Sequence, residues 1–62
     1  MNLREEAKVA KNKEALSEIK KIGNRRMNEI VSDPNVKNSV KKSARTKYRL
    51  LSREIKRRAK KL

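Results

Sequence analysis

The sequence predicts an all-α fold: an antiparallel helical hairpin formed by residues 13–32 and 34–61, with an additional helical segment at the N-terminus. Two observations lead to this prediction. Apolar residues recur at intervals of three and four in both long segments, as they do along one face of an amphipathic helix. The single proline lies between the two segments, and a short connection between amphipathic helices favours an antiparallel pair.

The N-terminal segment, residues 2–15, is only weakly amphipathic. Leu3, Ala7 and Ala10 share one face, and good helix formers fill most other positions. This face does not continue into the apolar face of the segment that follows. We therefore expect the N-terminal helix either to fray or to dock on something outside the chain.

The first helix of the hairpin has a stronger apolar face, which contains Gly23. The face consists of Leu16, Ile19, Gly23, Met27 and Ile30, with Ile22 and Val31 at its edges. Gly23 allows two interpretations: it ends one helix as a cap, or it is a point of close contact within a longer helix. Because the apolar spacing is unchanged across Gly23, one continuous helix is favoured.

The connection is predicted at the Ser-Asp-Pro-Asn run of residues 32–35. A residue before proline is disfavoured in helical conformation, so Asp33 can cap a helix whose first residue is Pro34. A start two or three residues later, capped by Asn35, is the alternative. The basic helix of residues 36–62 would be about 40 Å long. Its partner is shorter, so we expect its C-terminal end to project unless the N-terminal segment folds back over it.

The length and composition of the chain indicate a single small domain, residues 1–62, with a thin core. Hydrophobic residues make up 34% of the chain, and 5 of them are alanine. Chains this short are marginally stable alone. The absence of cysteine and histidine excludes disulfides, thiol nucleophiles and the usual transition-metal ligands. There is no glycine-rich phosphate loop, so we expect neither an enzyme, a cofactor nor a small-molecule substrate.

The charge is strongly positive and unevenly distributed. The chain has 20 Lys and Arg against 7 Asp and Glu, a net charge of +13. Residues 37–62 hold 12 of the basic residues and one acid, Glu54, which makes +11. This asymmetry indicates a binding surface for an anionic partner. No stretch has the length of a membrane span or a signal peptide, so we expect a cytoplasmic protein.

Six basic residues form what we call the cationic rail: Lys42, Arg45, Arg49, Arg53, Lys56 and Lys60. Their spacings of 3, 4, 4, 3 and 4 place them on one face of a helix. The opposite face is an apolar stripe of Val36, Val40, Ala44, Tyr48, Leu51, Ile55 and Leu62. Solvated helix faces normally mix acids with bases, and this one does not. Cations repeated along a line are what phosphate binding requires, which favours a nucleic acid over a merely solvated or membrane-facing surface.

Further cations extend the predicted contact. Arg57, Arg58 and Lys61 continue the basic helix, and Arg25 and Arg26 add to the contact from the other arm of the hairpin. Ordinary surface charge is the alternative for Arg25 and Arg26. A disordered tail or nuclear-import signal is the alternative for the last seven residues. Tyr48 is the only aromatic residue, which disfavours a platform for stacking unpaired bases and favours recognition of the backbone.

The run from Met27 to Val36, followed by Ser39-Val40-Lys41-Lys42-Ser43-Ala44, resembles an uncharacterised archaeal family of small all-helical proteins. In that family a Glu-Ile helix end, an Asp-containing turn and a Val precede a basic helix; its proline directly after that Val is Lys37 here. In general character the chain is also similar to the small basic helical proteins of ribosomes, archaeal ones especially.

These observations predict a non-catalytic RNA-binding protein that contacts the phosphate backbone. We expect structured RNA, with the chain acting as a ribosomal or ribosome-associated protein beside neighbouring ribosomal proteins. A double-stranded DNA-binding chromatin or phage protein is the nearest alternative. A helical protein-interaction module, or a homodimer formed through residues 16–30, is the alternative from a different class.

Overall fold

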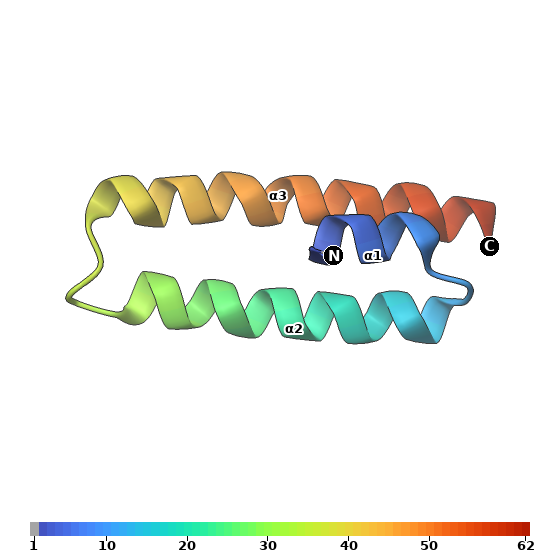
Figure 1. The fold of residues 1–62 in the computed structure, drawn as a ribbon, viewed down its shortest axis with the longest axis horizontal. Coiled ribbons are helices and arrows are strands. Elements are labelled where there is room, and N and C mark those ends of the chain that lie inside the picture. Colours follow the sequence, from blue (N-terminus) through green and yellow to red (C-terminus); the bar gives the residue numbers. More distant parts are fainter. Residues whose placement is uncertain (1) are drawn as a thin grey trace.

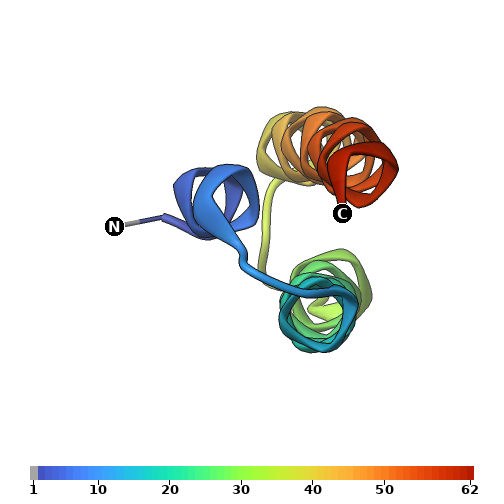
Figure 2. The same ribbon diagram turned by 90° about the vertical axis from the view of Figure 1, so that its right-hand side faces the viewer.

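In residues 2–62, which the computed structural model describes, three helices pack side by side in an up–down–up arrangement (Figures 1 and 2). Helix α1 spans Leu3–Val9, α2 spans Lys13–Ser32 and α3 spans Asn38–Lys61. The expected all-α fold with an antiparallel hairpin is confirmed. The bundle is narrow, with Cα extents of 39 × 18 × 15 Å.

Two asparagines start the first two helices. The side-chain oxygen of Asn2 accepts a hydrogen bond from the backbone N–H of Glu5 at 2.9 Å, and that of Asn12 accepts one from Ala15 at 2.8 Å. Each satisfies an N–H group that the first turn of a helix leaves without a partner. Asn12 therefore separates α1 from α2 and sets the start of α2 at residue 13.

Helix α2 is continuous through Gly23, as its apolar spacing predicts. The backbone of Gly23 is helical and has no positive φ, so it is not a cap. Gly23 is buried against α3, and a methyl group at this position would lie 2.8 Å from Leu51 Cδ2 and 3.4 Å from Tyr48 Cδ1. A side chain here would displace Leu51, so glycine favours the close approach of the two long helices.

The connection between α2 and α3 is longer than predicted. Helix α3 begins at Asn38, not at Pro34, and both predicted caps are wrong. Asp33 instead follows the last residue of α2, and its side chain accepts a hydrogen bond from the Asn35 backbone N–H at 2.9 Å. This is an Asx turn, in which an Asp side chain bonds the backbone two residues on. Lys37 precedes α3 and provides no side-chain cap.

Helix α1 folds back onto the hairpin, which confirms that alternative for the N-terminal segment. The expectation that it frays or docks outside the chain is wrong. In Figure 1, α1 lies beside the C-terminal half of α3, and in Figure 2 the three helices occupy the corners of a triangle. Ala7 is fully buried and Ala10 nearly so, in one cluster with Leu16, Ile19 and Leu51. Ile55 and Ala59 of α3 pack against this cluster. The C-terminal end of α3 is therefore covered by α1.

The apolar stripe of α3 is buried only in part. Ala44 and Leu51 are buried, and Tyr48 and Ile55 are half-buried. Val40 and Leu62 are 49% and 44% exposed, and Val36 lies in the connection rather than in the helix. The expectation for these three residues is corrected, because each lies beyond the part of α3 that faces α1 or the middle of α2.

We predict that Gly23→Leu lowers the free energy of unfolding by about 1–3 kcal/mol, because the added side chain must displace Leu51 and Tyr48 from a packed contact. Thermal unfolding followed by circular dichroism measures the change. Asn28→Leu is the matched control, since Asn28 is exposed on the same helix. Equal stability of the two variants would contradict the close contact.

Candidate nucleic-acid interface

All six residues of the cationic rail are exposed on α3. Leu51, which is buried, lies two residues from both Arg49 and Arg53, and two residues correspond to a rotation of about 200° around a helix. The rail therefore faces away from α1 and α2. From Lys42 to Lys60 it extends over about 27 Å, with one cation per helical turn. Because the helix is uninterrupted, these cations lie along a straight line.

No acid accompanies the rail on the outer face of α3. The outer face of α2 is different: it carries Glu14, Glu18 and Glu29 among its cations. Within residues 2–62 the single ion pair joins Lys21 Nζ to Glu18 Oε1 at 3.8 Å, on α2. The two long helices thus present contrasting surfaces. That of α2 has the mixed charges of an ordinary solvated face, whereas that of α3 is uniformly positive.

Glu54, the only acid of residues 37–62, lies on the inner side of α3. It is 9% exposed, in a depression whose other lining residues are all basic: Lys8, Arg57, Arg58 and Lys61. A carboxylate among four cations reduces their mutual repulsion where α1 packs on α3. Glu54 therefore lowers the charge density at the helix interface without lowering that of the rail.

Arg58 has a structural contact that the sequence did not suggest. Its Nε donates a hydrogen bond to the backbone carbonyl oxygen of Ala10 at 2.8 Å, and its side chain is partly buried. Ala10 is the C-terminal cap of α1, and a carbonyl at that position has no partner within the helix. Arg58 thus joins α1 to α3 across 48 residues of sequence. Arg57 and Lys61 are exposed beside it.

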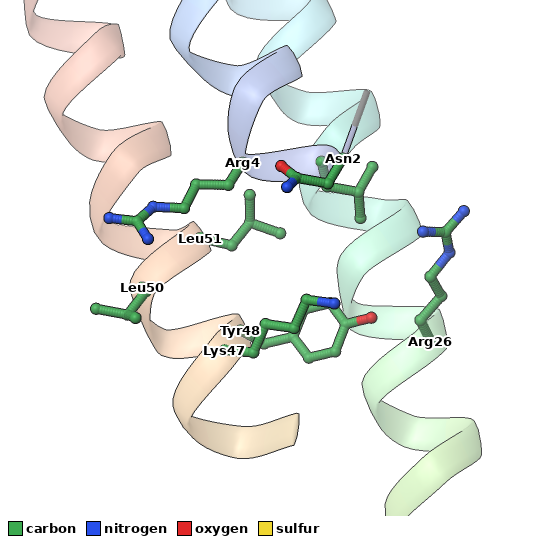
Figure 3. Close-up of a pocket in the computed structure, with 8 residues that line it drawn as sticks. Asn2, Arg4, Arg26, Lys47, Tyr48, Leu50 and Leu51 are labelled. Atoms are coloured by element: carbon green, nitrogen blue, oxygen red, sulfur yellow. The ribbon is translucent and has the colours of Figure 1, made fainter. Parts of the chain in front are cut away.

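The structure separates Arg25 from Arg26. Both are exposed, but consecutive residues point about 100° apart around a helix. Arg26 lines a pocket where α1 begins, together with Arg4 of α1 and Lys47 of α3 (Figure 3). Arg4 and Lys47 were not identified as candidates from the sequence. Neither belongs to a periodic basic pattern, so only the packing of three helices brings them to the same place as Arg26.

Within residues 2–62 there is no group of His, Cys, Asp or Glu side chains that could hold a metal ion. In the same part of the chain, none of the helices combines the length and the apolar character needed to cross a membrane. What the arrangement provides is a line of positively charged hydrogen-bond donors, which suits phosphate oxygens.

Comparison of the chain with protein families, with curated proteins and with solved structures found no match. The charge and geometry of the helices are therefore the basis for any functional conclusion.

We predict that Arg58→Ala speeds amide hydrogen exchange in α1 by about 3- to 10-fold, which is the equivalent of one net hydrogen bond. The reason is that α1 loses its link to α3. Arg57→Ala removes the same charge from a neighbouring exposed position and should leave exchange in α1 nearly unchanged. If Arg58→Ala and Arg57→Ala change the exchange rate of α1 equally, the effect arises from lost charge rather than from the hydrogen bond with Ala10.

Proposed function

We propose that this protein binds nucleic acid through the phosphate backbone, without catalysis. The observation that carries the proposal is the cationic rail: six exposed cations on one rigid helix with no acid among them. Binding a polyanion along this line releases its condensed counterions, which provides affinity without reading the sequence. The net charge of +13 adds long-range attraction.

Structured RNA is the favoured ligand, in the cytoplasm and in association with the ribosome. Two properties support this choice: a thin core that an anionic partner would stabilise, and the scarcity of side chains suited to base-edge readout. Double-stranded DNA is the alternative, since a single helix also fits its major groove. If the protein belongs to the ribosome, it should co-sediment with one subunit through high-salt washing. Recovery with DNA or in free fractions would contradict the ribosomal proposal.

A homodimer formed through residues 16–30 has less support. Leu16, Ile19 and Gly23 of this face are buried within the bundle by α1 and α3. The bundle would have to open before a second copy could occupy the same face. Oligomerisation that persists when the rail is neutralised would favour this alternative.

We predict that the double change Arg49→Gln and Arg53→Gln weakens RNA binding and flattens its salt dependence. The slope of log affinity against log salt should fall by up to about two units, because each lost phosphate contact removes up to about one. Titrations of a fluorescent RNA duplex at several salt concentrations measure this slope.

The control for this experiment is the double change Lys13→Gln and Lys21→Gln on α2. It removes two charges from exposed positions and leaves the rail intact. We expect its salt slope to stay close to that of the unchanged protein. If both double variants reduce the slope equally, net charge rather than the rail determines binding.

We also predict that folding is coupled to binding. Self-repulsion among 20 cations opposes a core with six buried apolar residues in the described range 2–62, so the isolated chain should be only partly helical at low salt. Adding RNA, or raising the salt concentration to screen the charges, should increase helicity measured by circular dichroism. Full cooperative folding at low salt without RNA would refute this coupling.

A further inference from the structure

A pocket lies where α1 begins, between all three helices. Its volume is about 190 Å³. Leu51 and the ring of Tyr48 line it from α3, and Asn2, which caps α1, lies beside it (Figure 3). The pocket exists because α1 is much shorter than its neighbours. Helices α2 and α3 continue past the first residue of α1 and leave a recess at its end.

Each helix contributes one cation to this pocket. Arg4 comes from α1, Arg26 from α2 and Lys47 from α3; in Figure 3 the guanidinium groups of Arg4 and Arg26 lie on opposite sides of Leu51, and the Lys47 side chain lies along the Tyr48 ring. None of the described lining residues is acidic. Two guanidinium groups, one ammonium group and the Tyr48 hydroxyl can all donate hydrogen bonds to an anion. This donor set suits a phosphate, which has several acceptor oxygens and accepts paired hydrogen bonds from arginine.

The pocket and the cationic rail lie on opposite sides of α3. Lys47 is two residues from both Arg45 and Arg49 of the rail, a rotation of about 200° around the helix. Lys47 contributes to the pocket between the helices, whereas the rail faces outward. Across its short axes the bundle measures 18 and 15 Å between Cα atoms. A straight duplex lying along the rail therefore does not reach the pocket.

We propose that the pocket binds a backbone phosphate of a second nucleic-acid segment, so that the protein bridges two segments across its width. This inference rests on the proposed function of the rail. Arg4, Arg26 and Lys47 neutralise the phosphate, and the apolar surface of Leu51 and Tyr48 contacts the adjoining sugar. A bridge also explains why cations occur on both sides of a bundle that has little core to oppose their repulsion.

A backbone phosphate fits the pocket better than an acidic helix of a partner protein does. A docked helix needs a continuous apolar surface several turns long. The exposed apolar residues of α3 are Leu50, which lines the pocket, and Val40, about three turns away, and cationic Lys47 lies between them along the helix. The recess itself has room for a phosphate and its sugar but not for a helix.

The test measures how many duplexes one protein binds. The full chain is mixed with an excess of a short RNA duplex little longer than the rail, and stoichiometry is determined by native mass spectrometry and sedimentation velocity. The salt concentration is about 0.15 M, where charges act over about 8 Å and one side of the bundle is screened from the other. We expect the unchanged protein to form a complex with two duplexes.

Three variants separate the two surfaces. The triple change Arg4→Gln, Arg26→Gln and Lys47→Gln should still form the one-duplex complex but weaken binding of the second duplex at least 10-fold. The triple change Lys11→Gln, Lys13→Gln and Lys21→Gln removes the same charge from exposed positions outside the pocket and should retain the two-duplex complex. The double change Arg49→Gln and Arg53→Gln should weaken the rail and leave the pocket cations in place.

The outcomes distinguish the inference from the proposed function. A single duplex on the unchanged protein, or two on the pocket variant, would overturn the bridge while leaving the rail intact. If the protein binds only one duplex and millimolar inorganic phosphate occupies the pocket, the pocket is a site for a free anion. That result would also overturn the bridge. If the variant with Arg49→Gln and Arg53→Gln binds the first duplex as tightly as the unchanged protein does, the proposed function is refuted. Loss of the two-duplex complex in both triple variants would assign it to net charge and refute the pocket.

Discussion

The close packing of Leu51 and Tyr48 against Gly23 holds the two long helices together, and both cationic surfaces depend on it. With no side chain at Gly23, α3 approaches α2 closely enough to bury Leu51. Small residues also lie at the contact between α1 and the hairpin, where Ala7 and Ala10 form most of the buried surface of α1. Helices with small side chains at their contacts pack closely, so three of them form a narrow bundle around few apolar atoms.

A narrow bundle has little apolar burial to offset electrostatic repulsion. Hydrophobic stabilisation increases with buried area, and among residues 2–62 six apolar residues are buried in a chain whose net charge is +13. The position of each charge therefore matters. The rail faces away from the core, Glu54 lies among the cations next to α1, and Arg58 uses its charge to bond the end of α1. In the proposed function an anionic ligand would relieve the remaining repulsion, which would link the stability of the fold to binding.

Local patterns in the sequence were sufficient to predict a residue's role where that role depends only on its own helix. The extent of α2 and its continuity through Gly23 follow from an unbroken apolar spacing, and the rail follows from cations at helical intervals. The first residue of α3 could not be predicted from such local patterns. Asp33 and Pro34 are good helix-start residues, but the Asp33 side chain bonds Asn35 in a turn instead, and competition of this kind between cap and turn is common for Asp.

The sequence alone therefore determined the helical class, the two long helices and the line of cations along the last one, because helical periodicity is a property of neighbouring residues. Only the tertiary structure decided where α1 lies, what Arg58 bonds and which cations meet. The apolar face of α1 is too small to identify its partner, and Arg4, Arg26 and Lys47 belong to three separate helices. They come together because α1 packs in the groove of the hairpin and ends partway along it, a position set by side-chain fit between segments distant in the chain.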